Sequence, residues 1–257
     1  MDQQHAIFQL WDELADFDAM QTADASRHLL HSLAGMLKAK NACWIAAVRT
    51  AEDEDDPMRG WRIARTGYLV NDPVNEAVVR ELRSRWARRE IDPLTRHTLK
   101  QSGQCFRVFS LRQAMSADWF GTSDYKRLYE SRGVYDCIMA AFPLSQDAEC
   151  GIVIHASPER GAFDNDDLAL AWEVLRGLKW FLRRILHEHS LLIASSPLSP
   201  AERRTLSSLL TGATEKEIGL NLDLSPHTVH QYAKSIYRKY GVKGRAGLMS
   251  LWLNRMP

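Results

Sequence analysis

The sequence has few cysteines and no long hydrophobic run. Its four cysteines, Cys43, Cys105, Cys137 and Cys150, include no CxxC pair, so a protein with reduced thiols is the simplest interpretation. No segment approaches 18 consecutive apolar residues, and the N-terminal stretch MDQQHAIFQLWDELADFD is acidic. A signal peptide would be basic and then apolar, and a membrane helix would need a longer apolar run. These features argue against secretion and membrane insertion and predict a cytoplasmic protein.

Motifs for catalysis and metal binding are missing as well. The sequence contains no HExxH pattern, no glycine-rich phosphate loop, no nucleophile elbow around serine and no Cys-His motif. The closest histidine pairs are His28/His31 and His187/His189, and neither comes with a clear carboxylate as third ligand. We therefore predict that the protein is not an enzyme, with no catalytic residues, no metal site and no cofactor.

Charge is distributed unevenly along a chain that is nearly neutral as a whole, at +1. From residue 199 onward there are nine Lys and Arg and four Asp and Glu, so this segment carries +5 and residues 1–198 carry −4. A small basic segment beside an acidic remainder is expected when one domain of a protein binds a polyanion.

Residues 199–257 contain three helix starts in a row. Ser199–Glu202 and Thr214–Glu217 have the pattern of capping boxes, and Ser225-Pro226 is a cap followed by proline. Gly212 and Gly241 lie where helix ends favour a residue that tolerates positive φ. The segment is therefore predicted to fold as four helices joined by short turns, over residues 200–211, 214–221, 226–240 and 244–254.

The third of these helices has one apolar and one polar face. At 3.6 residues per turn the apolar face comprises Val229, Tyr232, Ala233, Ile236 and Tyr240. The opposite face comprises His227, His230, Gln231, Lys234 and Arg238. That polar face has no carboxylate, and a helix fits the major groove of DNA, where such side chains meet base edges and phosphates. Together with the preceding helix it predicts a helix-turn-helix.

Residues 198–253 resemble the C-terminal helix-turn-helix of LuxR/FixJ-type (GerE-like) regulators. The matching segments follow in order and without gaps: Leu198–Arg203, Gly212–Ile218, Leu224–Val229, Ile236–Val242 and Arg245–Leu248. The resemblance implies an all-α, four-helix DNA-binding domain of a bacterial transcription regulator.

The same resemblance implies positions for the contacts with double-stranded DNA. It assigns base contacts to His230, Gln231 and Lys234, and backbone contacts to Lys216, Thr228, Arg238 and Lys239. Many members have Lys or Arg where this chain has His230, so a relative's operator does not transfer directly. Gln231 can pair with adenine, and Lys234 can donate to guanine.

A homodimer is the assembly that the resemblance implies. In the family the fourth helix often pairs two domains, and the exposed apolar candidates for this role in the present chain are Leu248, Met249 and Trp252. Such a dimer places two recognition helices about one DNA turn apart on a roughly palindromic site. RNA polymerase and a small-molecule effector are further candidate partners.

Residues 1–193 alternate between helical and strand-like patterns. Helical spacing covers residues 4–39, 73–89, 123–131 and 164–192, and strand-like runs cover residues 42–50, 61–69, 105–109, 134–143 and 150–156. This order predicts an α+β domain with an antiparallel sheet flanked by helices. Residues 194–198 are the predicted linker to the DNA-binding domain, residues 199–257, because Ala194–Pro197 are small and polar and include a proline.

The order of these elements resembles that of GAF or PAS-like sensor domains. Arg160–Leu170 is similar to the opening of the last helix in many GAF domains. The resemblance implies a sensory and dimerisation domain over residues 1–193, without indicating a particular ligand. Aromatic candidates for a ligand pocket are Trp44, Trp61, Trp86, Trp119, Tyr125 and Tyr135.

Two alternatives stay open beside the main prediction of a dimeric, sequence-specific transcriptional regulator. Trp86 and Asp92-Pro93 resemble part of an acyl-homoserine-lactone-binding domain, which would make the protein a quorum-sensing regulator, although the Gly-rich Thr-x-Pro segment is missing. The terminal helices could instead serve protein contacts alone, in a ligand- or partner-binding adaptor that does not bind DNA. The carboxylate-free face of residues 226–240 favours DNA binding over the adaptor.

Overall fold

The chain divides into two compact units. The computed structural model describes residues 3–18, 21–49, 55–71, 73–100, 102–189, 191 and 198–253. The first unit joins Met1–Leu10 with Arg27–Lys179, and the second joins Trp11–Ser26 with Trp180–Pro257. The domain limits 1–193, 194–198 and 199–257 stay predictions, and residues 194–197 of the linker lie outside the described residues.

A five-stranded antiparallel sheet forms the centre of the first unit, with strand order β2-β1-β5-β4-β3. The strands are β1 (Asn41–Arg49), β2 (Trp61–Tyr68), β3 (Arg107–Ser110), β4 (Asp136–Ser145) and β5 (Ala148–Ala156). The strands β4 and β5 are joined by a tight turn, and both are buried along most of their length. All five predicted strands are confirmed, with shifts of a few residues at their ends.

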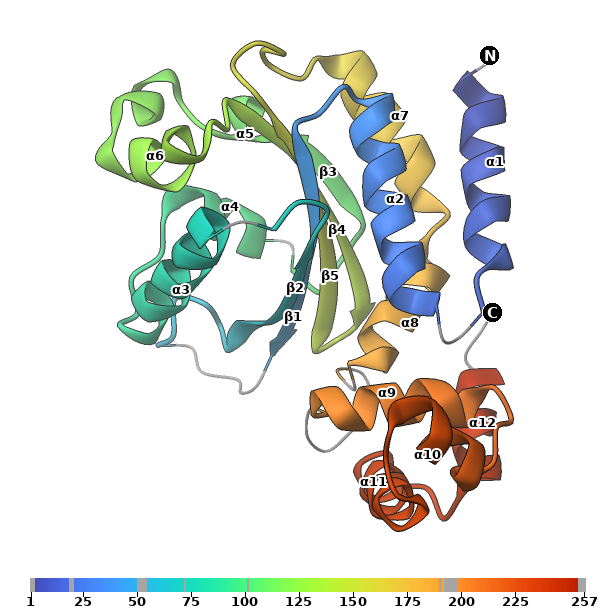
Figure 1. The fold of residues 1–257 in the computed structure, drawn as a ribbon. Helices are drawn as coiled ribbons and strands as arrows, with labels where there is room; N and C mark the ends of the chain where they lie inside the picture. The colour runs from blue at the N-terminus through green and yellow to red at the C-terminus, as the bar shows by residue number, and fades with distance from the viewer. Residues whose placement is uncertain are drawn as a thin grey trace. The chain divides into compact units, whose positions relative to one another are not determined.

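Helices lie on both faces of this sheet (Figure 1). One face is covered by α2 (Thr22–Met36), from Arg27 onward, and by α7 (Asn165–Arg176). The other is covered by α3 (Pro73–Ala87), α4 (Pro93–Leu99), α5 (Leu111–Ala114) and α6 (Ser123–Leu128), with short 3-10 turns η2 (Ala117–Gly121) and η3 (Glu130–Arg132). The α+β prediction is therefore confirmed, whereas α4, α5 and η2 were not predicted.

Two predicted helices are each divided in the structure. The pattern over residues 4–39 forms α1 (Gln3–Asp16) and α2, and the pattern over residues 164–192 forms α7 and α8 (Lys179–Glu188). Gly177 ends α7, and the Leu178 amide donates to the Leu175 carbonyl at 2.9 Å, a tight turn instead of a continuing helix. Glycine has a lower helix propensity than every residue except proline. The helix therefore ends at Gly177, although the apolar spacing continues beyond it.

The second unit contains the predicted four-helix segment. Its helices are α9 (Pro200–Leu210), α10 (Glu215–Leu222), α11 (Pro226–Lys239) and α12 (Arg245–Leu253). The capping boxes at Ser199 and Thr214 and the cap at Ser225 all form as predicted. The same unit includes α8, whose Arg184 donates to the Phe17 carbonyl and the Thr22 hydroxyl.

Interdigitated apolar side chains hold these four helices together. The buried cluster comprises Leu198, Leu206, Leu209, Ile218, Val229, Ala233, Ile236, Tyr240 and Leu248. Leu248 therefore belongs to the core of the domain, which corrects its prediction as an exposed pairing residue. Met249 is partly buried, and the side chain of Trp252 lies outside the described residues.

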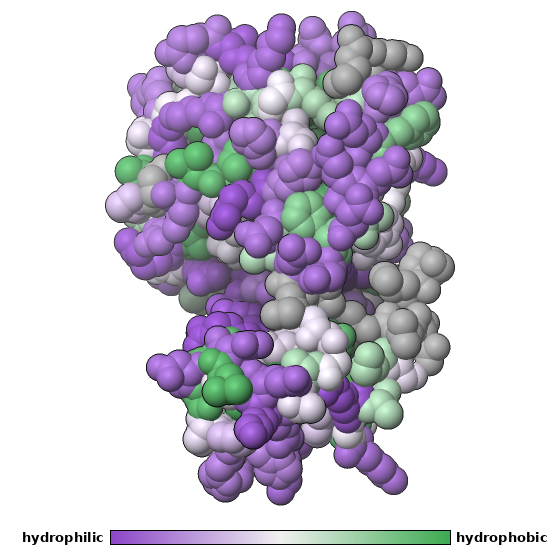
Figure 2. Space-filling view, turned by 45° about the vertical axis from the view of Figure 1, so that its right-hand side comes forward, coloured by the Kyte–Doolittle hydropathy of each residue, from purple (hydrophilic) through white to green (hydrophobic). Residues whose placement is uncertain are grey.

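The face of the molecule in Figure 2 is mostly hydrophilic, with hydrophobic residues in small separate groups. Among the residues that the structure describes, the exposed large hydrophobic side chains are Phe8, Val70, Val74, Trp172 and Leu220. In the described ranges no helix is long and apolar enough to cross a membrane. Cys43, Cys137 and Cys150 are buried and Cys105 is exposed, and none of the four forms a disulfide.

Candidate nucleic-acid interface and ligand pocket

The turn between α10 and α11 depends on a close backbone approach at Gly219. Asp223 adopts the left-handed conformation, with φ of 54°, and the amides of Asp223 and Leu224 both donate to the Gly219 carbonyl. A Cβ atom on Gly219 would lie 2.7 Å from the Leu224 carbonyl oxygen, which is closer than real Cβ contacts. Glycine at this position lets the chain reverse tightly enough for α11 to pack on α10.

Gly219→Ala is expected to lower the free energy of unfolding of the helix-turn-helix by about 1–3 kcal/mol, because backbone atoms must shift to admit the methyl group. Thermal unfolding followed by circular dichroism would measure the loss. The matched control is Gly35→Ala in α2, where a Cβ atom meets nothing within 4 Å and alanine is expected to stabilise the helix. Equal stability of the Gly219 and Gly35 variants would contradict the conclusion that the turn between α10 and α11 requires glycine at position 219.

The polar face of α11 is open to solvent in the second unit. His227, Gln231, Lys234 and Arg238 are exposed, while Val229, Ala233 and Ile236 are buried on the opposite face. Two of the three predicted base-contacting residues, Gln231 and Lys234, are thus free to reach a groove. The third, His230, has its Nδ1 3.1 and 3.2 Å from the two carboxylate oxygens of Glu215.

The four residues predicted to contact the DNA backbone have different environments. Lys216 and Arg238 are exposed, with no ion pair to another described residue. Thr228 is partly buried, and its hydroxyl lies 2.8 Å from that of Ser225 at the start of α11. Lys239 is mostly buried, and its Nζ lies 2.7 Å from a carboxylate oxygen of Glu202. The contact predicted for Lys239 would therefore compete with an ion pair inside the domain.

Glu202 connects α9 to the end of α11. Its carboxylate accepts from the Ser199 amide at 2.6 Å, from the Ser235 hydroxyl at 2.7 Å and from Lys239. Burial by itself raises the pKa of this carboxyl. The hydrogen bonds from Lys239, Ser199 and Ser235 outweigh burial and lower the pKa to about 2. Glu202 thus stays ionised and fixes the C-terminal end of α11.

The carboxylates of Glu202 and Glu217 lie away from the polar face of α11, so most of that face keeps its positive charge. Glu202 is buried, and Glu217 accepts from the Thr214 amide and hydroxyl at the start of α10. Glu215 is the carboxylate that contacts the polar face of α11. Its contact with His230 was not predicted, because the two residues are 15 positions apart and belong to different helices.

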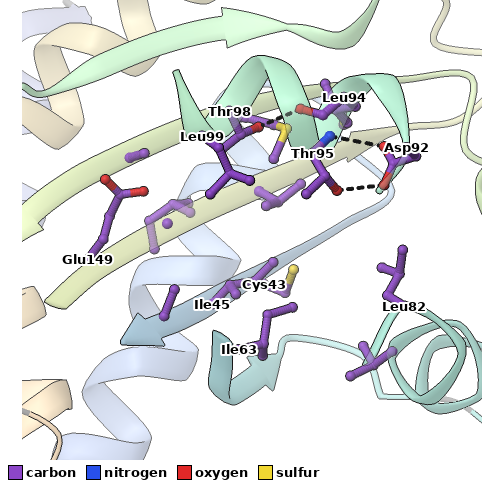
Figure 3. Close-up of a pocket in the computed structure, with 18 of the residues that line it drawn as sticks. Cys43, Ile45, Ile63, Leu82, Asp92, Leu94, Thr95, Thr98, Leu99 and Glu149 are labelled. Atoms are coloured by element: carbon purple, nitrogen blue, oxygen red, sulfur yellow. Dashed lines mark hydrogen bonds between the residues drawn. The ribbon is translucent and has the colours of Figure 1, made fainter. Parts of the chain in front are cut away.

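A cavity of about 190 Å³ lies inside the first unit, between the sheet and the helices on one face (Figure 3). The sheet contributes Cys43, Ile45, Ile63, Phe109, Met139 and Val153. The helical side contributes Val78, Leu82, Trp86, Leu94, Thr95 and Leu99. Its lining is mainly apolar, as in sites that bind small molecules.

Most polar groups at this cavity already have partners. Asp92 begins α4 and accepts from the Thr95 amide at 3.0 Å and the Thr95 hydroxyl at 2.5 Å (Figure 3). Glu149 is paired with Arg107. Burial, together with Arg132 and Lys40, lowers the pKa of His155 to about 3, so its imidazole is neutral at ordinary pH. The indole N–H of Trp86 is buried and has no acceptor in the described part of the chain.

The six aromatic residues predicted for a pocket do not lie together. Trp61 and Trp86 line the cavity. Trp44 lies over Gly67 on the opposite face of the sheet, because it stands between the cavity-lining residues Cys43 and Ile45 and side chains alternate along a strand.

The other three aromatic residues are not part of the cavity lining. Trp119 and Tyr125 pack in a cluster that includes the lining residues Cys43 and Leu94. The ring of Tyr135 lies 3.7 Å from the guanidinium carbon of Arg112. These three residues, like Trp44, shape the domain without contacting the cavity.

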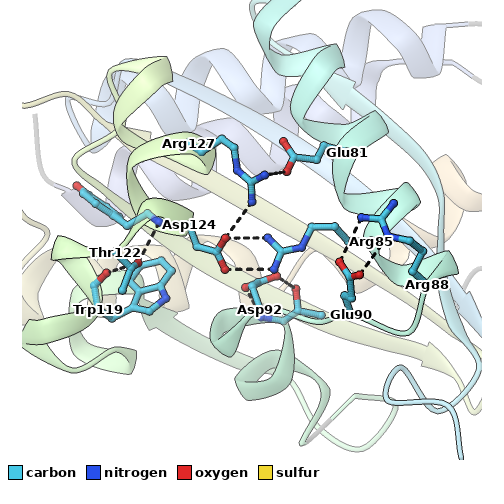
Figure 4. A network of polar contacts seen from close by, with 11 residues as sticks. Glu81, Arg85, Arg88, Glu90, Asp92, Trp119, Thr122, Asp124 and Arg127 are labelled. Atoms are coloured by element: carbon cyan, nitrogen blue, oxygen red, sulfur yellow. Dashed lines mark hydrogen bonds and ion pairs between the residues drawn. The ribbon is translucent and has the colours of Figure 1, made fainter.

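Ion pairs hold α3, which lines the cavity, against α6 (Figure 4). The Arg85 guanidinium donates two hydrogen bonds to the Asp124 carboxylate, at 3.0 and 3.2 Å, and Arg127 bridges Asp124 and Glu81. The hydrogen bond from Arg85 is the main cause that lowers the pKa of Asp124. This network fixes the helix that presents Val78, Leu82 and Trp86 to the cavity.

Comparison with known proteins identifies the second unit's helical domain. Residues 196–252 match the family described as bacterial regulatory proteins, luxR family. The C-terminal domain is a luxR-family helix-turn-helix domain. The probable HTH-type transcriptional regulator GfsR of Streptomyces halstedii is 39% identical to this chain over 62 residues, 23% of this chain. Those residues are 26% of GfsR, so the chain matches about a quarter of the length of that curated relative.

Solved structures resemble the chain over nearly its full length. A crystal structure of Escherichia coli SdiA is 16% identical, covers 99% of this chain and 98% of its own, and gives a TM-score of 0.51. A structure of SdiA in complex with octanoyl-rac-glycerol is 17% identical, covers 98% and 94%, and gives a TM-score of 0.48. At a TM-score of 0.51, the first of these structures shows that the chain shares the fold of SdiA, an α+β region followed by a helical region. The GAF/PAS-like assignment of the first region stays a prediction.

Proposed function

We propose that the protein is a sequence-specific DNA-binding transcriptional regulator that acts as a homodimer in the cytoplasm, without catalytic activity. The observation that supports it is the exposed face of α11, where Gln231, Lys234 and Arg238 are exposed on a luxR-family domain. An amide and two cations on a helix that fits the major groove can meet base edges and phosphates. Lys216 extends the positive surface onto α10.

Lys234→Ala and Arg238→Ala are expected to weaken DNA binding in different ways. Loss of Lys234 should cost about 1–3 kcal/mol at the specific site and relax the choice of one base pair. Loss of Arg238 should weaken binding to all sequences alike and reduce the slope of log K against log salt by about 1. Fluorescence anisotropy on selected and random duplexes, over a range of salt concentrations, measures both effects.

The matched control is Lys126→Ala, which removes an exposed cation from α6 in the other unit. It should leave affinity and salt slope unchanged. Binding of the wild-type protein that neither depends on salt nor distinguishes sequences would contradict the proposal and favour the adaptor that serves protein contacts alone.

We further propose that the cavity of the first unit binds a small, mostly apolar effector. A closed apolar cavity of 150 Å³ admits a molecule such as benzene, and this cavity is somewhat larger. The unpartnered N–H of Trp86 favours a ligand with a hydrogen-bond acceptor. An acyl-homoserine lactone, with an apolar chain and carbonyl groups, meets both conditions and is the probe to use first.

Trp86→Phe is expected to weaken lactone binding about 5- to 100-fold, because it removes the donor and keeps most of the ring. Titration calorimetry with N-acyl-homoserine lactones of increasing chain length measures the effect. Trp44→Phe, on the opposite face of the sheet, is the matched control and should leave affinity unchanged. Equal weakening by both substitutions, or no binding of any lactone to the wild-type protein, counts against a lactone effector.

A further inference from the structure

The contact between His230 and Glu215 joins the recognition helix to the helix before it. The imidazole Nδ1 lies 3.1 and 3.2 Å from Oε1 and Oε2 of Glu215. The two side chains are 45% and 40% exposed, so the pair lies at the surface that the proposed function turns toward DNA. Glu215 is the first residue of α10, and Val229 and Ala233 anchor α11 beside it.

The partner determines which ring nitrogen of His230 is protonated. A carboxylate has no proton to donate and only accepts hydrogen bonds. Nδ1 must therefore carry the proton in this contact. In the neutral imidazole the other nitrogen, Nε2, then has a lone pair and accepts hydrogen bonds.

We propose that Glu215 is a positioning residue for specificity, which makes His230 a hydrogen-bond acceptor for the exocyclic amino group of adenine or cytosine in the major groove. Those amino groups are the donors on the base edges, whereas guanine presents only the acceptors N7 and O6 there. His230 should therefore disfavour guanine at its position. The inference rests on the proposed DNA binding and adds the type of base edge that one residue recognises.

The neighbouring side chains complement this role. Lys234 follows His230 by one helical turn and can only donate, and Gln231 can donate and accept. The polar face of α11 would then combine an acceptor in His230, a donor in Lys234 and an amide in Gln231 that both donates and accepts hydrogen bonds. A phosphate contact by His230 would instead need a proton on Nε2, since phosphate oxygens only accept.

The test is selection of binding sites from a randomised duplex pool by the full-length protein at pH 8. Wild-type protein should enrich adenine or cytosine over guanine at one position. Glu215→Gln keeps the size of the side chain, but its amide either donates or accepts and no longer fixes the tautomer. The preference should fall about three- to tenfold at that position alone, while the choices made by Gln231 and Lys234 persist.

Two controls separate tautomer control from simple charge removal. Glu217→Gln removes a carboxylate from the same helix and retains the capping box, so it should leave every base preference unchanged. In a His230→Ala background, Glu215→Gln should have no further effect on base preference. If Glu215 merely repels DNA, its replacement strengthens binding to all sequences equally and leaves the ratios unchanged, which would overturn the proposal.

A measurement without DNA distinguishes a failure of the proposed role of Glu215 from a failure of the proposed DNA binding. Nitrogen-15 NMR of the free protein at pH 8 should find Nδ1 of His230 protonated and Nε2 bare, and Glu215→Gln should reduce that bias. A protonated Nε2 in the wild-type protein would overturn the tautomer assignment even if the protein binds DNA. The expected tautomer without any sequence selection would count against the proposed DNA recognition, and with it against the role of Glu215 in specificity.

Discussion

Glu149→Ala is expected to lower the free energy of unfolding of the first unit by about 3–5 kcal/mol. Glu149 and Arg107 form two short contacts, with Nη2 2.8 Å from Oε1 and Nη1 2.9 Å from Oε2, and both side chains are less than a tenth exposed. Arg107 keeps its hydrogen bonds to the Thr98 carbonyl and the Ser102 hydroxyl after the substitution. The substitution removes the carboxylate that makes both short contacts with this buried positive charge, which costs far more than the loss of an exposed pair.

Urea denaturation followed by tryptophan fluorescence measures this loss. Asp147→Ala is the matched control, because it breaks the Arg49–Asp147 pair, in which the aspartate is 63% exposed, and should cost less than about 1 kcal/mol. Replacing both buried partners, Arg107→Met with Glu149→Leu, should recover most of the stability, since it removes the charges together. A Glu149 variant as stable as the Asp147 variant would show that the buried charge is otherwise compensated.

The buried pair also bears on the cavity. Glu149 and Ser102 both line it, and Glu149 accepts from the Gly103 amide at 3.0 Å. The pair joins β3 to β5 at the edge of the proposed effector site, and the bonds to Ser102 and Gly103 tie the segment before β3 to the same place. Loss of Glu149 should therefore weaken effector binding together with stability, whereas Trp86→Phe should affect binding more than stability.

The C-terminal domain could be predicted closely because its signals are local. Ser199, Thr214 and Ser225 act within three residues of themselves, and each begins a helix where the sequence indicates one. The apolar spacing of α11 likewise identified Val229, Ala233 and Ile236 as buried. The five strands were found for the same reason, since each apolar run is bounded by turn residues.

The parts that could not be predicted depend on contacts between distant segments. Arg107 and Glu149 are 42 positions apart, and Glu202 and Lys239 are 37. Alternation along β1 separates Trp44 from Cys43 and Ile45, but the sequence does not indicate which face receives α3 and α4. Of the six aromatic residues predicted for a pocket, Trp61 and Trp86 line the cavity, and their contact with a ligand stays a prediction.

Glu202→Ala is expected to lower the free energy of unfolding of the DNA-binding domain by about 3 kcal/mol at pH 7, from the difference between a folded pKa of about 2 and the ordinary value of 4.5. The substitution removes the acceptor of the Ser199 amide and the Ser235 hydroxyl, and also the carboxylate that forms an ion pair with the mostly buried Lys239. The end of α11 should loosen, and DNA affinity should fall with stability.

The pH dependence identifies the carboxylate as the cause. The pKa of Glu202 is lower in the folded state than in the unfolded state, so its contribution is fully present above pH 4.5 and is lost as the pH falls toward 2. The difference in stability between wild-type and Glu202→Ala proteins should therefore shrink over that window in urea titrations. Glu217→Ala, at an exposed carboxylate that also caps a helix, is the matched control and should cost less. A difference that stays constant from pH 7 down to pH 2 would mean that Glu202 acts through packing and not through its charge.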